Sequence, residues 1–182
     1  MHLQKLKILM IGPSESGKST IANFISESVN IEECETRPTQ GVRIVEFEVP
    51  NLNINGKQIK VDIELWDCSG DHKFESCWPA LRLGVKGVIL VGSSNTANIA
   101  SRELELLYNY FVSQPKLSMK QCVVFYNCFD DQDDIDVLSL SPTFSRVSQV
   151  ATNVKTRSDR LKIDFTNFVL SVVQSVNKIE DY

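Results

Sequence analysis

The first residues with a recognisable chemistry form a phosphate-binding pattern near the start of the chain. Residues 12–19 fill every fixed position of the pattern G-x-x-x-x-G-K-[ST]. In such a loop, backbone N–H groups donate to phosphate oxygens, a lysine reaches the β- and γ-phosphates, and a hydroxyl ligates Mg²⁺. A Gly/Ser loop that matches by accident is the alternative. The predicted phosphate-binding residues are Gly12, Pro13, Ser14, Glu15, Ser16, Gly17, Lys18, Ser19 and Thr20.

The segments on either side of this loop have the patterns that its chemistry requires. Residues 6–11 are an apolar run typical of a buried strand. After the loop, Ile21, Phe24 and Ile25 fall at helical spacing, which predicts a helix that opens at Gly17. The loop therefore lies in a strand-to-helix turn, where the positive end of the helix faces an anion.

A predicted hairpin follows further along the chain. Residues 42–49 and 59–66 read as strands, and the second alternates strictly between apolar and polar side chains. The Asn55-Gly56 pair between them is a strong hairpin signal, so the two strands should pair antiparallel. Pro50 cannot donate to a ladder, which places the first strand at the sheet edge.

The rest of the chain alternates between strands and helices. This pattern predicts one α/β domain over residues 1–182, with a mostly parallel central sheet, one antiparallel edge strand and helices on both faces. Ligands in such sheets bind at the carboxyl ends of the strands, where the phosphate loop, residues 67–71 and residues 127–130 should converge. The remaining expected strands cover 85–91, 121–126 and 146–151, and the remaining expected helices lie near 78–83, around 104–111 and from about 158 onward.

Composition restricts the classes of partner and compartment. The chain has 182 residues, is 42% hydrophobic and 23% charged, and carries a formal net charge of −4, which argues against nucleic acid as the main partner. Its five cysteines show no metal-type pairing, and an odd number predicts free thiols in a reducing compartment. The first and last residues lack a signal peptide, a myristoylation glycine and a cysteine to prenylate, so we expect no direct lipid anchor.

Taken together, the motifs resemble those of Ras-like small GTPases in order and spacing. Thr39 resembles the switch threonine that ligates Mg²⁺ and senses the γ-phosphate. Residues 66–70 resemble W-D-x-x-G, in which Asp67 would hold Mg²⁺ through water and the Gly70 N–H would meet the γ-phosphate. Residues 127–130 resemble N-K-x-D, in which Asn127 and Asp130 belong to the base-binding loop and the aspartate reads the guanine edge.

This resemblance implies GTP or GDP and Mg²⁺ as cofactors, with Ser19, Thr39 and Asp67 as the metal ligands. Thr152 and Asn153 occupy the place of the last base-binding loop. Each assignment has a structural alternative. Thr39 and Asp67 would also suit ordinary turns, and Asn127 and Asp130 would also suit a solvent-exposed, aspartate-rich loop.

A closer resemblance is to the Rab-like small GTPase subunit of intraflagellar transport complex B. Residues 38–44, Pro-Thr-Gln-Gly-Val-Arg-Ile, and residues 74–81, Phe-Glu-Ser-Cys-Trp-Pro-Ala-Leu, carry it. The resemblance implies a protein of the cytoplasm and the cilium or flagellum that binds coiled-coil subunits of that complex and so belongs to a hetero-oligomer.

Two positions depart from the pattern of hydrolytic relatives. Asp71 stands where most of them have glutamine, and an ionised carboxylate cannot donate to the transferring phosphoryl group. We therefore expect weak or absent intrinsic hydrolysis and assign no catalytic residue. Cys128 replaces the lysine whose stem packs on the base, which predicts weaker nucleotide binding.

Several functions fit these motifs. The preferred one is a binding module whose segments around Thr39 and from Asp67 to about Leu83 become ordered by GTP and Mg²⁺ and then dock on a protein partner. The alternative is a conventional hydrolytic switch in vesicle or ciliary trafficking that uses an activator protein. A small-molecule kinase is disfavoured because the last third of the chain has no arginine cluster, and a vesicle-targeting Rab because no C-terminal cysteine is present.

Overall fold

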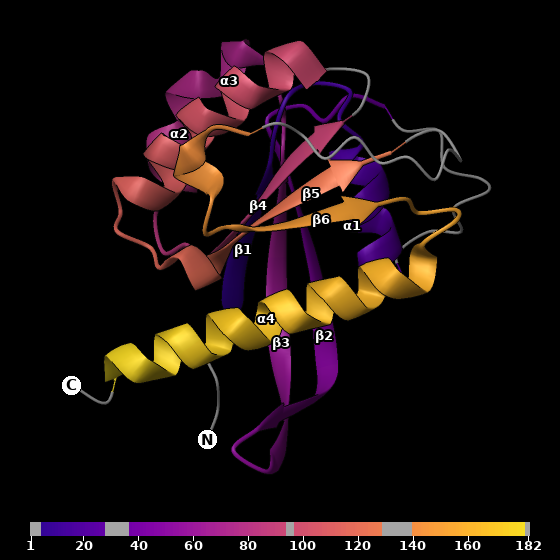
Figure 1. Ribbon diagram of the computed structural model, residues 1–182, viewed down its shortest axis with the longest axis vertical. Helices are drawn as coiled ribbons and strands as arrows, with labels where there is room; N and C mark the ends of the chain where they lie inside the picture. Colours follow the sequence, from indigo (N-terminus) through magenta and orange to yellow (C-terminus); the bar gives the residue numbers. More distant parts are fainter. Residues whose placement is uncertain (1–4, 28–36, 94–96, 129–139, 181–182) are drawn as a thin grey trace.

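A six-stranded sheet forms the centre of the computed structural model, which describes residues 5–27, 37–93, 97–128 and 140–180 (Figure 1). The strand order is β2-β3-β1-β4-β5-β6, and only the β2–β3 pair is antiparallel among these strands. The predicted mostly parallel sheet with one antiparallel edge strand is confirmed. The strands are β1 (Leu6–Ile11), β2 (Val42–Ile54), β3 (Lys57–Cys68), β4 (Gly87–Ser93), β5 (Cys122–Asn127) and β6 (Ser148–Thr152).

The predicted hairpin is present, and its strands are longer than the hydrophobic alternation indicated. Asn55 and Gly56 both have positive φ angles, 52° and 78°, as a tight two-residue hairpin turn requires. Near this turn the strands are mostly polar, so their pattern does not mark them as part of the sheet. The β2–β3 register shifts between Val49 and Leu52, where Asn51 has a φ of 60°. This bulge lies beside Pro50, on an edge strand as predicted.

Helices cover both faces of the sheet, as the sequence predicted (Figure 1). On one face, α1 (Lys18–Ile25) and α4 (Ser158–Glu180) pack on alternate residues of β1 and β3, such as Ile8 and Ile63. On the other, α2 (Trp78–Leu81) and α3 (Ala97–Tyr108) pack around Leu9 and Leu90. A π-helical turn (Asn109–Ser113) continues α3, and short 3-10 segments cover His72–Cys77, Met119–Gln121 and Pro142–Phe144.

Element boundaries differ from the predictions by a few residues, for local reasons. β4 begins at Gly87 rather than Val85, and β6 begins at Ser148 rather than Arg146. The Val147 N–H donates to the Phe144 carbonyl, so the chain is still turning where a strand was expected. The carboxyl ends of the parallel strands nevertheless share one edge, where the predicted site segments follow them.

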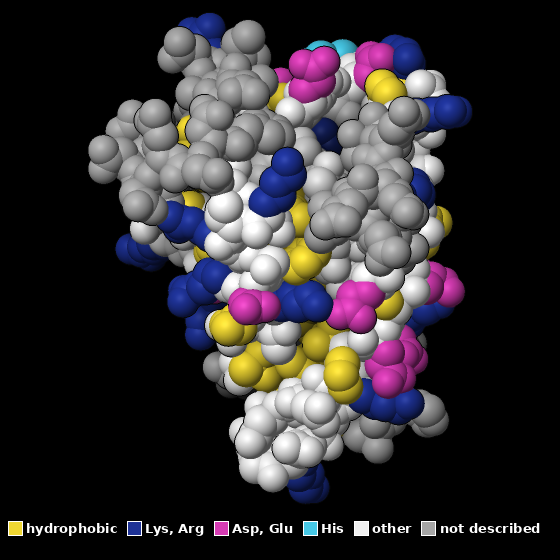
Figure 2. Space-filling model, turned by 90° about the vertical axis from the view of Figure 1, so that its right-hand side faces the viewer, with side chains coloured by type: hydrophobic (Ala, Val, Ile, Leu, Met, Phe, Trp, Pro, Cys, Tyr) yellow, Lys and Arg dark blue, Asp and Glu magenta, His cyan; other side chains and the backbone are white. Residues whose placement is uncertain are grey.

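The surface has mixed charge on the face drawn in Figure 2. Lysine or arginine side chains lie next to aspartate or glutamate side chains across its middle, above a group of hydrophobic side chains. Cross-strand ion pairs such as Lys60–Glu48, 2.8 Å apart, are of this kind. No helix of the described residues combines the length and the apolar character needed to cross a membrane.

Candidate functional site

The phosphate loop connects β1 to α1, as its sequence context predicted. Gly17 caps α1 in the left-handed conformation, with a φ of 87°, which glycine adopts without strain. At Gly12, an added Cβ would lie 2.0 Å from the Val91 carbonyl oxygen, so any side chain there would collide with β4. Ser14 and Glu15 are exposed at the tip of the loop. These features give a tight loop whose backbone opens toward the start of a helix.

Lys18 lies under this loop rather than in solvent. Its ammonium group donates to the carbonyl oxygens of Gly12 and Pro13, at 2.9 and 2.6 Å. Only 7% of the residue is exposed, and this burial lowers the pKa of Lys18 to about 8, against the opposing effect of Asp67. The lysine therefore stabilises the loop through these hydrogen bonds. Because its ammonium group is poorly hydrated, it loses little hydration when an anion binds in the loop.

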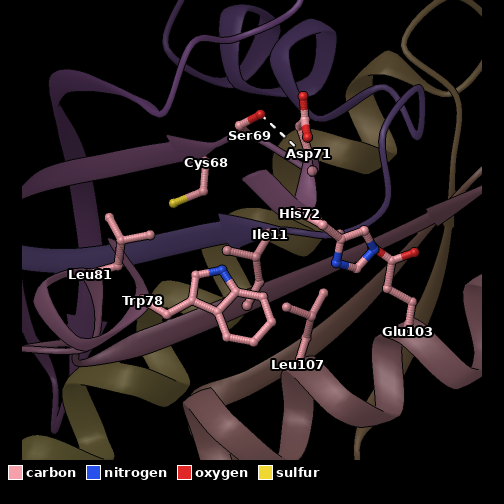
Figure 3. A pocket seen from close by; sticks show the side chains of 11 residues that line it. Ile11, Cys68, Ser69, Asp71, His72, Trp78, Leu81, Glu103 and Leu107 are labelled. Carbon is pink, nitrogen blue, oxygen red and sulfur yellow. Dashed lines mark hydrogen bonds and ion pairs between the residues drawn. The ribbon is translucent and has the colours of Figure 1, made fainter. Parts of the chain in front are cut away.

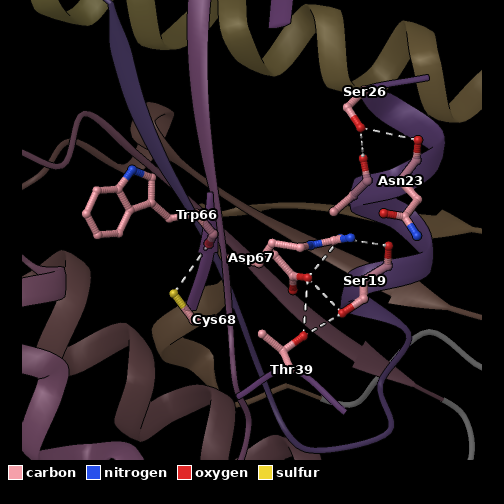
Figure 4. A network of polar contacts seen from close by, with 9 residues as sticks. Ser19, Asn23, Ser26, Thr39, Trp66, Asp67 and Cys68 are labelled. Atoms are coloured by element: carbon pink, nitrogen blue, oxygen red, sulfur yellow. Dashed lines mark hydrogen bonds and ion pairs between the residues drawn. The ribbon is translucent and has the colours of Figure 1, made fainter. Parts of the chain in front are cut away.

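The three predicted metal ligands point toward one another (Figure 4). The Ser19 hydroxyl donates to Asp67 Oδ2 at 2.7 Å and lies 2.9 Å from the Thr39 hydroxyl, which is 3.4 Å from the same carboxylate oxygen. Ser19 comes from α1, Thr39 from the segment before β2 and Asp67 from the end of β3. Three positions far apart in the sequence thus form one polar cluster.

This cluster has the chemistry of a magnesium site. Mg²⁺ is commonly held by one or two carboxylates together with waters and substrate phosphates. Asp67 is fully buried, and its Oδ1 atom has no hydrogen-bond partner in the part of the chain that the structure describes. A buried acceptor without a donor is a costly arrangement that a metal-bound water would relieve. The residues therefore fit a magnesium ion that is also bound to phosphate.

The chain that follows β3 touches the phosphate loop directly. A Cβ added to Gly70 would lie 2.4 Å from the Ser14 nitrogen and 2.6 Å from the Gly12 carbonyl oxygen. One residue earlier, the Ser69 N–H donates to the Gly41 carbonyl at 2.8 Å. These contacts join the D-x-x-G segment to the phosphate loop on one side and to the Thr39 segment on the other.

Asp71 is exposed and engaged with a neighbour. Its side chain accepts the Lys73 backbone N–H at 3.0 Å and pairs with the Lys73 ammonium at 2.8 Å. These contacts lower the pKa of Asp71, so this carboxyl group is ionised at neutral pH. Asp71 therefore brings a negative charge to the edge of the phosphate loop.

A small hollow next to Asp71 is lined by His72 and Glu103, whose contact the sequence analysis missed (Figure 3). His72 Nε2 lies 3.6 Å from a Glu103 carboxylate oxygen, and His72 Nδ1 contacts Glu75. The Glu75 contact and the charge of Glu103 raise the pKa of His72. No local pattern links position 72 to position 103, so only tertiary structure reveals that the His72–Cys77 segment is tied to α3.

On the base side, two of the predicted residues, Asn127 and Thr152, lie at the ends of the neighbouring strands β5 and β6. The Asn127 side chain donates to the Ser16 carbonyl at 3.1 Å, which ties the end of β5 to the phosphate loop. Thr152 is the register partner of Asn127, and its hydroxyl donates to the Tyr126 carbonyl. The Asn153 side chain accepts backbone N–H groups of the turn before α4. Asp130 lies outside the described residues.

Arg43 also belongs to the cluster, although the sequence analysis did not assign it there. Its guanidinium Nη2 atom lies 3.1 Å from Asp67 Oδ2. Counting outward from the Asn55-Gly56 turn would pair Arg43 with Cys68, and the bulge moves the pairing by one residue so that Arg43 faces Asp67. A count from the turn therefore misplaces Arg43 by one residue, so the sequence did not assign it to the cluster.

The segment around Trp78 divides between core and surface. Leu81 is buried, and Trp78 packs against Tyr110 and Phe111 at ring-centroid distances of 5.2 and 5.4 Å. Cys77 and Pro79 are exposed. Leu81 and Trp78 are thus part of the core, and only Cys77 and Pro79 of these four residues are open to a partner.

Comparisons with known proteins agree on one family. A family model described as Roc, Ras of Complex, domain of DAPkinase, matches residues 7–130. The human intraflagellar transport protein 22 homolog is 40% identical over 178 residues, which cover 97% of this chain and 95% of the human protein.

Solved structures of similar fold include a GTP-bound crystal structure of Trypanosoma brucei IFT22/74/81. The chain matched there has a TM-score of 0.79 at 23% identity, with 97% of this chain and 99% of that chain covered. A GDP-bound T. brucei IFT22 structure has a TM-score of 0.70 at 24% identity, with coverage of 95% and 99%. At these identities the likeness concerns the fold.

Proposed function

Because this chain belongs to the intraflagellar transport protein 22 family of Ras-like GTPases, we propose that it is a guanine-nucleotide-binding subunit of intraflagellar transport complex B. GTP or GDP, together with Mg²⁺, is its ligand, and residues 1–182 act as one G domain. It works in the cytoplasm and the cilium or flagellum. The similar T. brucei chains were solved with GTP and with GDP, which supports this choice of ligand.

One observation carries the proposal: Lys18, Ser19, Thr39 and Asp67 meet around a tight glycine loop. Each of these side chains suits a different part of a magnesium–triphosphate complex. The lysine supplies a positive charge for the phosphates, the two hydroxyls and the carboxylate supply hard oxygen ligands, and the α1 N-terminus supplies backbone donors. When bound, Mg²⁺ neutralises charge on the β- and γ-phosphates.

We assign base recognition to Asn127, Asp130, Thr152 and Asn153. The described part of this group supports the assignment, since Asn127 braces the phosphate loop and lies beside Thr152 at the strand ends. Cys128 is half-buried at the position where relatives carry a lysine over the base. We therefore expect a dissociation constant on the order of micromolar for GTP rather than the far tighter binding of ordinary Rab proteins.

Coiled-coil subunits of complex B are the proposed partners. The GTP-bound T. brucei structure that resembles this chain is of an IFT22/74/81 assembly. In our chain, the Thr39 segment and the residues after Asp67 are joined by the Ser69 to Gly41 hydrogen bond. Nucleotide and Mg²⁺ would thus order both segments together and present one surface to a partner.

The test is nucleotide uptake by the purified chain, because a ligand held with micromolar affinity dissociates during purification and must be added back. In a titration of the nucleotide-free chain, we expect GTP and GDP to bind at least about tenfold more tightly than ATP, because a carboxylate reads the guanine edge. Equal binding of ATP would contradict the assignment of Asn127 and Asp130. Protein that takes up no nucleotide at all would contradict the proposed function.

Hydrolysis should be slow, at or below about 10⁻⁴ per second, because Asp71 puts a negative charge where a water-positioning glutamine is needed. Asp71→Gln should raise the single-turnover rate about tenfold, since the amide donates a hydrogen bond and removes like charge. Asp62→Gln makes the same change of charge at an exposed position of β3 and should leave the rate unchanged.

A fast wild-type rate, or no gain in Asp71→Gln, would contradict this account of Asp71. The alternative function, a hydrolytic switch, requires a partner that accelerates turnover. Adding complex B subunits to the single-turnover assay separates the two functions. We expect the rate to stay within about twofold, whereas an activator protein would raise it by orders of magnitude.

A further inference from the structure

Arg43 brings a second positive group into the polar cluster around Asp67. Its Nη2 atom lies 3.1 Å from Asp67 Oδ2 and 3.5 Å from the Ser19 carbonyl oxygen. The same Oδ2 atom accepts the hydroxyls of Ser19 and Thr39. One carboxylate oxygen therefore receives two hydroxyls and a guanidinium, and the guanidinium connects β2, β3 and α1.

The local fold holds Arg43 in this position. Arg43 and Asp67 are directly opposite in the β2–β3 ladder, so their side chains project from the same face of the hairpin. The side chain is 41% exposed, but its Nε atom is buried and has no hydrogen-bond partner among residues 5–27, 37–93, 97–128 and 140–180. The inner part of the arginine is thus inserted beside the cluster.

Asp67 needs a nearby cation in every state of the protein. A fully buried, ionised carboxylate is costly unless it is paired. The Lys18 ammonium is directed to the carbonyl oxygens of Gly12 and Pro13, so it does not contact Asp67 directly. Arg43 is the group in contact, and a guanidinium is the side-chain cation best suited to a buried ion pair.

We propose that Arg43 is a positioning residue that acts as an internal cation at the magnesium site. In the absence of Mg²⁺ it neutralises Asp67 and keeps Ser19 and Thr39 gathered around it. The guanidinium would share the charge of that carboxylate with a bound Mg²⁺, which would weaken the hold of Asp67 on the ion. The chain therefore binds nucleotide with a reduced dependence on Mg²⁺. This inference rests on the proposed guanine-nucleotide function.

The test uses a fluorescent, non-hydrolysable GTP analogue. The quantity measured is the dissociation constant in excess EDTA divided by the dissociation constant in excess Mg²⁺. Arg43→Gln should raise this ratio about tenfold over the wild type, because coupling between two cations at one site is reciprocal and typically of this size. Lys60→Gln removes a cation that also pairs across β2 and β3, with Glu48, and should leave the ratio unchanged.

The outcomes separate the two proposals. A ratio in Arg43→Gln equal to that of the wild type overturns the role of Arg43, while binding in the wild type still supports the proposed function. No binding by the wild type with or without Mg²⁺ overturns the proposed function. If Arg43→Gln does not fold, Arg43→Lys decides the matter. Its ammonium keeps the positive charge, so the ratio should stay within about threefold of the wild type, and a rise as large as the one expected for Arg43→Gln overturns the inference.

Discussion

Lys18→Ala should lower the affinity of the chain for GTP and GDP by at least about a hundredfold, to the limit of detection. The ammonium has two roles that alanine cannot replace. It donates to the carbonyl oxygens of Gly12 and Pro13 and so holds the shape of the loop. It also supplies a positive charge at the phosphate loop, and charge-assisted hydrogen bonds are stronger than neutral ones. Equilibrium titration with fluorescent GDP measures the loss.

Two matched variants show whether this effect is specific to the site. Lys60→Ala removes a lysine of equal charge from the exposed part of β3 and should bind nucleotide as the wild type does. Ser19→Asn keeps the Lys18 charge and removes a predicted metal ligand. Its nucleotide affinity should therefore fall when Mg²⁺ is present and fall less in EDTA. Unchanged GTP binding in both Lys18→Ala and Ser19→Asn would contradict the assignment of the phosphate loop.

The sequence predicted those parts of the fold whose signals are local. The apolar run before the loop became β1 with the predicted bounds, and the Asn55-Gly56 pair became the turn of the β2–β3 hairpin. The family resemblance, read from residues 38–44 and 74–81, is confirmed by the full-length human relative. These predictions succeed because a phosphate loop and a two-residue hairpin each require particular residues at fixed spacing.

Predictions that depend on register or on distant contacts were less accurate. The bulge between Val49 and Leu52 shifts the hairpin by one residue, and this shift brings Arg43 to Asp67. A one-residue slip moves every side chain to the other face of a strand, so no count from the turn could place Arg43 correctly. The assignment of Asp130 to the guanine edge stays a prediction, because that residue lies outside the described part of the chain.

Gly70→Ala should lower nucleotide affinity by about ten- to a hundredfold. The added Cβ would lie 2.4 to 2.6 Å from backbone atoms of Gly12, Pro13 and Ser14. Backbone atoms cannot rotate away as a side chain does, so the phosphate loop and the D-x-x-G segment must separate. A displacement of about 1 Å in a positioned site is enough for losses of this size. Titration with fluorescent GTP and GDP, alongside urea unfolding, measures binding and stability separately.

Gly56→Ala is the control that separates a loss of stability caused by backbone strain from a loss of nucleotide binding at the site. Gly56 has a φ of 78° and no atom within 4 Å of an added Cβ, so alanine there is strained but not crowded. We expect it to lose about 1 kcal/mol of unfolding free energy with unchanged nucleotide affinity. Gly70→Ala should lose about 1–3 kcal/mol through crowding and lose binding as well. If both variants bound nucleotide as tightly as the wild type, the contact between Gly70 and the phosphate loop would have no part in holding the site.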